Sequence, residues 1–167
     1  VPPRGRGLLI VSGSANAYTF EQLRRRRGGR IVNLARERVQ TENCAACLRR
    51  GETLILAAAC GPEDLVKNPS EAYHAELSDT LSSLTKELLT QSGVRNLAVF
   101  GGDTVRAILE RLSCHRVRSG GYLEEGVPVC EAETDLGEIC LVTKSGGLGS
   151  PGVVSHMMDY YEGRIEE

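Results

Sequence analysis

Apolar runs of strand length alternate with helix-like patterns along this chain, and this alternation restricts the fold more than any other feature. Residues 7–12 read Gly-Leu-Leu-Ile-Val-Ser, and similar continuous runs occupy 53–59 and 96–100. Such runs are typical of strands that are covered on both faces, as in parallel sheets. The alternation therefore predicts a single α/β domain with a mainly parallel sheet flanked by helices, rather than a sandwich or a helical bundle.

The expected elements and their boundaries follow from the same patterns. Strands are expected at 7–12, 30–34, 53–59, 96–100, 127–131 and 138–143. Helices are expected from near Thr19, over 35–50, from Pro69-Ser70, over 104–112, and from Ser150-Pro151 to about Tyr161. The local signals are a Thr19/Gln22 capping box, a stripe of Leu77, Leu81, Leu84 and Leu88, and a C-terminal cap at Gly93.

Composition and charge exclude several classes of function. The 167 residues suit one domain, and a net charge of −2 argues against binding nucleic acid or an acidic membrane. No run approaches the roughly 20 apolar residues of a membrane span, and no secretory signal is present, so we expect a cytoplasmic protein. The first residue is Val1 rather than Met, which favours a piece of a longer polypeptide.

The six cysteines and three histidines do not form a metal site. Cys44 and Cys47 have metal or redox spacing, but no second pair or nearby histidine completes a zinc set. The other cysteines stand singly, most of them in apolar surroundings, so all six are expected to be reduced; they are Cys44, Cys47, Cys60, Cys114, Cys130 and Cys140. His74, His115 and His156 are isolated in the sequence, and we expect no metal ligation.

Three polar or glycine-rich loops follow predicted strands, where open α/β sheets bind their ligands. They are 12–16 (Ser-Gly-Ser-Ala-Asn), 101–104 (Gly-Gly-Asp-Thr) and 144–149 (Lys-Ser-Gly-Gly-Leu-Gly). In the second loop, Asp103 or Thr104 can cap the next helix, whose amides favour an anion, or Asp103 can hold Mg²⁺. In the third loop, backbone amides can wrap a phosphate while Lys144 supplies charge. Each loop alone also fits an ordinary turn.

Two charged segments are interpreted as solvated surface. Arg24 to Arg27, with Arg30, form a basic run at a helix end, where cations complement the helix dipole. Glu124 and Glu125 lie in a glycine-containing turn and are expected to face solvent.

In the order in which they occur, these motifs resemble the C-terminal nucleotide-binding domain of the four-carbon acid sugar kinases, a family that includes tetronate and threonate kinases. The resemblance rests on 11–14, 100–104, 126–128 and 144–149, and it covers nearly the whole chain. It implies that residues 1–167 are the nucleotide-binding part of a larger two-domain kinase, which phosphorylates a hydroxyl of a small sugar acid. The sugar acid would be bound by an N-terminal domain that this sequence lacks.

The resemblance also implies ATP with Mg²⁺ as the ligand, and a half-enzyme that holds the nucleotide without turning over by itself. The residues it places at the nucleotide are Ser14, Gly101, Gly102, Asp103, Thr104, Gly146 and Gly147. The catalytic base and the identity of the sugar acid are not assigned. Neither is the oligomeric state, for which a homo-oligomer is one alternative.

Two other classes of function fit the loops as well. The first is a non-catalytic nucleotide-binding module that senses ATP or regulates a partner. The second is a structural or assembly domain in which the glycine loops are only turns. Nucleotide binding would separate the second from the kinase, and phosphoryl transfer would separate the first.

Overall fold

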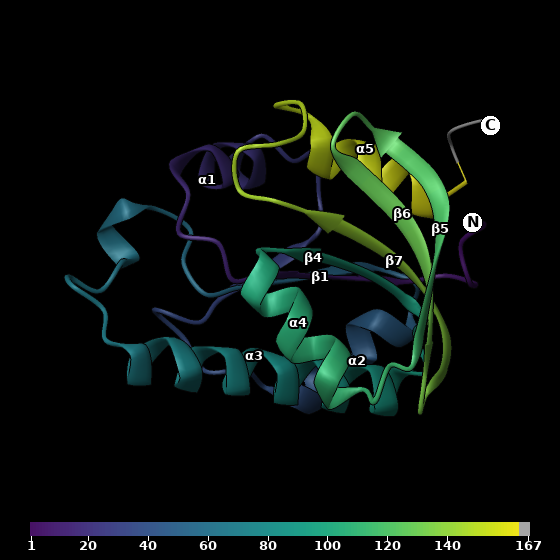
Figure 1. Ribbon diagram of the computed structural model, residues 1–167, viewed down its shortest axis with the longest axis horizontal. Coiled ribbons are helices and arrows are strands. Elements are labelled where there is room, and N and C mark those ends of the chain that lie inside the picture. The colour runs from purple at the N-terminus through teal and green to yellow at the C-terminus, as the bar shows by residue number, and fades with distance from the viewer. Residues whose placement is uncertain (164–167) are drawn as a thin grey trace.

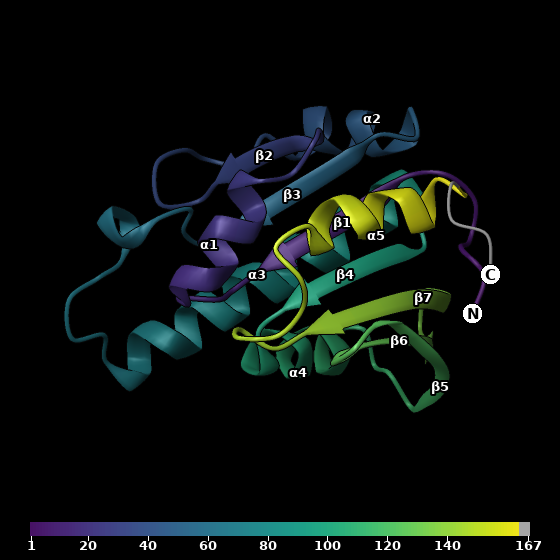
Figure 2. The same cartoon turned by 90° about the horizontal axis from the view of Figure 1, so that it is seen from above.

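The computed structural model describes residues 1–163 and contains one seven-stranded sheet with helices on both faces (Figures 1 and 2). The strand order is β2-β3-β1-β4-β7-β6-β5. The first five of these strands run parallel to one another, and the last two form an antiparallel hairpin at one edge. The prediction of an α/β domain with a mainly parallel sheet is confirmed.

The strands and helices have the following bounds. The strands are β1 (Leu8–Ser12), β2 (Arg30–Asn33), β3 (Thr53–Ala57), β4 (Asn96–Phe100), β5 (Arg116–Glu124), β6 (Val127–Thr134) and β7 (Gly137–Lys144). The helices are α1 (Ala17–Arg24), α2 (Thr41–Arg49), α3 (Glu71–Ser92), α4 (Gly102–Arg111) and α5 (Val153–Tyr161), with a short 3₁₀ turn at Pro62–Asp64.

The two faces of the sheet are covered by different helices. Figure 1 shows α1 and α5 on one face and α2, α3 and α4 on the other. All residues of β1, β3 and β4 are buried, as their continuous apolar sequences require. In α3, Leu81 and Leu88 of the predicted leucine stripe are fully buried, while Leu77 and Leu84 pack at its margin.

Several helix starts differ from the prediction because another group satisfies the backbone. The N-cap of α1 is Asn16, whose side chain accepts from the Tyr18 amide, so Thr19 and Gln22 are not a capping box but lie buried within the helix. The helix predicted over 35–50 is shorter in the structure and spans Thr41–Arg49. Its first part is a turn, because Asn33 accepts hydrogen bonds from the amides of residues 35–37.

The predicted caps of α3 are confirmed, and so are the strand at 138–143 and the end of the last helix at Tyr161. Ser70 caps α3 through the Tyr73 amide, and Gly93 ends it in the left-handed conformation. Strand β5 was missed. Ser150 does not cap α5, since the N-cap is Gly152 and the Ser150 side chain bonds elsewhere.

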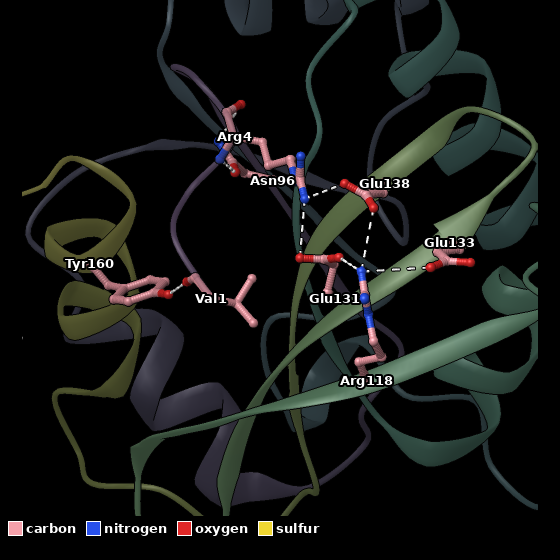
Figure 3. A network of polar contacts seen from close by, with 8 residues as sticks. All are labelled: Val1, Arg4, Asn96, Arg118, Glu131, Glu133, Glu138 and Tyr160. Carbon is pink, nitrogen blue, oxygen red and sulfur yellow. Dashed lines mark hydrogen bonds and ion pairs between the residues drawn. The ribbon is translucent and has the colours of Figure 1, made fainter.

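At the amino ends of the parallel strands, a polar network anchors the first residues of the chain (Figure 3). The buried Asn96 accepts from the Arg4 amide at 2.6 Å and donates to the carbonyls of Arg4, Gly5 and Gly7. Arg4 also pairs with Glu131 at 3.1 Å. The remaining contacts in the figure join Arg4 to Glu138, Arg118 to Glu131, Glu133 and Glu138, and the Tyr160 hydroxyl to the Val1 carbonyl.

Candidate functional site

The carboxyl ends of β1, β4 and β7 bring the three predicted loops together at one edge of the sheet, on the left in Figure 2. Backbone bonds join the loops directly. The Gly13 amide donates to the Phe100 carbonyl at 3.0 Å, and the Gly101 amide donates to the Lys144 carbonyl at 3.0 Å. Order in the sheet therefore places side by side three segments that are far apart in the sequence.

The second loop leads into α4, whose N-terminus has no side-chain cap. The N-cap is Gly101, with φ of 109°, a backbone angle that favours glycine. The prediction that Asp103 or Thr104 caps this helix was wrong. Thr104 is buried, and its Oγ1 lies so close to Gly13 that a Cβ built on Gly13 would be 1.9 Å from it. Asp103 is exposed in the first turn of the helix. The first-turn amides and the helix dipole are thus left to an external anion.

The first loop is held internally through Ser14. This side chain is 8% exposed; its Oγ accepts from the Asn16 amide at 3.1 Å and donates to Thr19 Oγ1 at 3.0 Å. The prediction placed Ser14 beside the nucleotide. In the structure it lies at the same edge of the sheet as the other two loops, and its hydroxyl organises the first loop.

Lys144, at the end of β7, is 2% exposed. Its Nζ donates to the carbonyls of Ser145 at 3.0 Å and Gly146 at 3.2 Å, and to Thr19 Oγ1 at 3.3 Å. The ammonium also lies 5.2 Å from the centre of the Phe100 ring. Burial lowers the pKa of Lys144 from its ordinary value to about 8.

Side chains of helix α1 hold the third loop through hydrogen bonds to its carbonyls. Gln22 Nε2 donates to the carbonyls of Leu148 at 3.1 Å and Ser150 at 3.0 Å, and the Tyr18 hydroxyl donates to the Gly149 carbonyl at 2.9 Å. Thr19 Oγ1 donates to the Gly146 carbonyl at 3.2 Å. One face of α1 is therefore polar because it fixes the backbone of residues 146–150.

Glu124 fixes the far end of the same loop. It accepts from both the amide and the hydroxyl of Ser150, and His156 Nδ1 lies 2.9 Å from its Oε2. Burial opposes ionisation of this carboxyl, but the hydrogen bonds from His156 and Ser150 outweigh it and hold the pKa of Glu124 below its usual value. The interpretation of Glu124 as solvated was wrong, because its carboxylate is held by Ser150 and His156.

At two positions of this edge, the fold itself does not require glycine. A Cβ built on Gly102 or Gly147 meets no atom within 4 Å, and neither residue has the left-handed backbone angle. Gly101 and Gly149, by contrast, have φ of 109° and 89°. A bare backbone that faces open space suits the close approach of a ligand.

Two neighbouring cavities flank these loops and share Gly126. One, of about 360 Å³, is lined by Gly102, Val105, Gly126, Pro128, Thr143, Lys144 and Ser145. The other, of about 520 Å³, is lined by Glu124, Glu125, Gly126, Gly147, Leu148, Gly149 and Ser150. A larger hollow of about 670 Å³ at the amino ends of the strands is lined mainly by the first residues of the chain and the end of α5. Strand direction favours the carboxyl edge over this larger hollow.

Comparison with known proteins shows the family to which this domain belongs. The family described as "Nucleotide-binding C-terminal domain" matches residues 9–154. The chain belongs to this family. The match confirms the resemblance to the C-terminal nucleotide-binding domain of four-carbon acid sugar kinases, and it establishes a nucleotide-binding domain of the type found in kinases.

Curated relatives of this nucleotide-binding domain are kinases by name. The 3-oxo-tetronate kinase of Cupriavidus necator is 28% identical over 160 residues, which cover 86% of this chain and 35% of that protein. The 3-oxo-tetronate kinase of Pseudomonas savastanoi pv. phaseolicola is 27% identical over 157 residues, with 86% and 36% covered. The chain therefore spans about a third of the length of these relatives.

Solved structures share the fold of the nucleotide-binding domain. A domain of unknown function from Bordetella bronchiseptica, a domain-swapped dimer with bound citrate, gives a TM-score of 0.72 at 21% identity and covers 94% of this chain and 42% of that one. A Haemophilus influenzae protein gives 0.70 at 18% identity, with 96% and 42% covered.

Sequence reasoning missed the roles of five residues that build this edge: Tyr18, Thr19, Gln22, Glu124 and His156. Lys144 was noticed as a charge, but its burial was not foreseen. Polar side chains on the inward face of α1 were the available signal, since buried polar groups are expensive unless they bond to something specific. Nothing in the sequence linked Glu124 to Ser150, which lies 26 residues away.

Proposed function

We propose that this domain binds ATP with Mg²⁺ at the carboxyl edge of β1, β4 and β7, as part of a kinase that phosphorylates a hydroxyl of a small sugar acid. The named kinase relatives support the reaction class and the sugar-acid substrate. Because the chain spans about a third of those relatives, the acceptor site and the catalytic base are assigned to the rest of such an enzyme. Six cysteines without disulfides and the use of ATP support a cytoplasmic location. Within residues 1–163, no helix has the length and apolar character that a bilayer crossing needs.

The uncapped N-terminus of α4 is the observation that carries the proposal. Its first-turn amides face the edge where the glycine loops meet, and Gly102 and Gly147 leave open space there. Phosphates bind well at helix N-termini because free amides and the dipole both favour negative charge. Gly102, Gly146 and Gly147 are therefore assigned to the phosphates. Gly101, Ser14 and Thr104 are assigned to holding the loops in place, since the Gly101 amide already donates to the Lys144 carbonyl.

Mg²⁺ would be held mainly by the nucleotide. Among the described residues, no group of three or more His, Cys, Asp or Glu side chains is arranged as a metal site. Mg²⁺ commonly binds through one or two carboxylates together with phosphate oxygens and water. The exposed Asp103, in the first turn of α4, suits that role. When bound, the ion offsets the charge of the phosphates.

The residues of this domain contribute to phosphoryl transfer by position and charge. Such transfer depends on alignment and on stabilisation of charge rather than on covalent help from the protein. The α4 amides and the third loop would fix the nucleotide, and Asp103 would orient the metal. The acceptor hydroxyl and its base would approach from outside this domain.

Calorimetric titration with MgATP tests the binding, and Asp103→Ala tests the metal role. Wild-type protein should bind MgATP, and the variant should bind it more weakly while binding Mg²⁺-free ATP about as well as wild type. Absence of MgATP binding would favour the alternative of a structural domain. Binding without transfer to any four-carbon sugar acid, in the enzyme carrying both domains, would favour a nucleotide-sensing module.

A further inference from the structure

Lys144 is a buried cation without a counter-charge. Within residues 1–163, no carboxylate lies within ion-pair distance of its Nζ, and its three partners are two carbonyls and one hydroxyl. Burying an ammonium group is costly, and a carboxylate normally offsets the cost. The fold could fill this position with an apolar residue, as it does beside Lys144 at Phe100. The charge therefore requires an explanation beyond folding.

The partners of Lys144 determine the orientation of the third loop. Its Nζ holds the carbonyls of Ser145 and Gly146 toward the protein interior. The described residues contain no cis peptide, and in a trans peptide the carbonyl and the following amide point to opposite sides. The amides of Gly146 and Gly147 must consequently point away from Lys144.

Both of these amides are available to a ligand. Among the hydrogen bonds of residues 1–163, none is donated by the amide of Gly146 or Gly147. Gly147 is exposed and has open space where a Cβ would be. Successive free amides form a concave anion site, and the uncapped α4 N-terminus lies at the same edge.

We propose that Lys144 is the positioning residue of the phosphate site: it holds two loop carbonyls inward so that the Gly146 and Gly147 amides face the phosphates, and its unpaired charge is balanced when they bind. The inference rests on the proposed nucleotide function and adds a residue to it. Thr19 assists, because its hydroxyl contacts both Lys144 Nζ and the Gly146 carbonyl.

The surroundings of Lys144 make its protonation responsive to a bound anion. Helix α1 faces it with Thr19, β4 with Phe100, and the loop with carbonyls. Among the described residues, no hydrogen bond or ion pair joins it to a titratable side chain. Glu124, from β5, and His156, from α5, hold the far end of the loop: Glu124 accepts from Ser150, and His156 lies against Glu124. Burial lowers the pKa of Lys144 to about 8, and a bound polyphosphate should raise it again.

The first test measures binding to wild type and two variants by calorimetry at pH 7.5. Lys144→Met keeps a side chain of similar length without charge or donors, and the exposed Lys86→Met is the matched control. We expect MgATP to bind Lys144→Met at least tenfold more weakly than wild type, and Lys86→Met to bind as wild type does. A Lys144→Met protein that is less stable but binds MgATP with wild-type affinity has lost only a structural residue, and the proposal is overturned.

The second test needs only wild-type protein and so remains decisive if Lys144→Met does not fold. MgATP binding is measured at pH 7.5, 8.5 and 9.5 in pairs of buffers with different ionisation enthalpies. We expect proton uptake on binding at pH 8.5, and an affinity that falls by up to about tenfold per pH unit above 8. Tight binding that is independent of pH, without proton uptake, overturns the role of Lys144 but leaves the nucleotide site standing. Absence of MgATP binding at every pH overturns both.

Discussion

Replacing Gly102 by alanine should affect the stability of the fold and the affinity for MgATP in opposite directions. Gly102 is the first residue of α4, its Cβ would meet nothing within 4 Å, and its backbone angle suits any residue. A glycine-to-alanine change at such a position stabilises a protein by about 0.4–1 kcal/mol, because it restricts the unfolded chain. We therefore expect a melting temperature equal to or slightly above that of wild type.

Binding should respond in the opposite direction. Cβ atoms at the start of a helix tilt toward its N-terminus, so the new methyl group would project toward the proposed phosphate position. Displacing a phosphate from one amide removes a charge-assisted hydrogen bond worth about 1.5–3 kcal/mol. This loss corresponds to MgATP affinity weakened by about 10- to 100-fold.

Thermal unfolding and MgATP calorimetry on one protein preparation provide the assay. Gly28→Ala is the control, because Gly28 also lacks the left-handed angle and has room for a Cβ, but lies before β2 at the opposite edge of the sheet. The control should leave affinity unchanged. If Gly102→Ala binds MgATP like wild type, the N-terminus of α4 does not hold the phosphates and the reasoning fails.

Three further predictions concern stability. Folding lowers the pKa of Lys144 to about 8, so the unfolded chain binds more protons than the folded one between about pH 8 and 10.5. The free energy of unfolding of wild type, relative to that of Lys144→Met, should therefore rise across that window by at most about 3 kcal/mol, and urea unfolding measures it. Glu124→Gln should lower the free energy of unfolding by about 1–3 kcal/mol at pH 7 and by less at pH 3, because the pKa of the carboxylate is lowered and its contribution is lost as pH falls. Thermal melts at both pH values measure this difference, and an equal loss at both would contradict it. Asn96→Ala should destabilise by at least about 1–3 kcal/mol and release the first residues of the chain, seen as faster amide exchange at Arg4, while MgATP affinity stays at the wild-type value.

The sheet and its order of elements could be predicted because buried parallel strands have an unmistakable composition. Strands β1, β3 and β4 are buried along their whole length, and each prediction fell within two residues of the structure. Strand β5 offered no such signal. Most of its residues are exposed, it contains Gly120-Gly121, and it forms the edge of the sheet, where pairing to β6 rather than burial holds it.

The site could be predicted as a set of loops but not as a set of contacts. Gly101, Gly102 and Gly147 could be singled out as candidates because glycine after a strand is a local signal. The roles of Thr19 and Gln22 depend on carbonyls more than 125 residues away, and no local pattern records such a pairing. The capping-box pattern placed these two residues at a helix start because it considers only their spacing in the sequence.

The distribution of buried polar groups gives the strongest physical argument for where this domain acts. Of the eleven buried polar or charged side chains among the described residues, six lie at the carboxyl edge: Ser12, Ser14, Thr19, Gln22, Thr104 and Lys144. Apolar residues would stabilise this edge more, since buried polar groups gain little even when they are hydrogen-bonded. The hydrogen bonds of Ser14, Thr19, Gln22 and Lys144 instead fix loop backbones. In the third loop, the amides of Gly146 and Gly147 have no partner within the described chain. An edge that gives up stability to hold free amides in a fixed direction is organised for an anion, and MgATP should therefore raise the melting temperature of this domain.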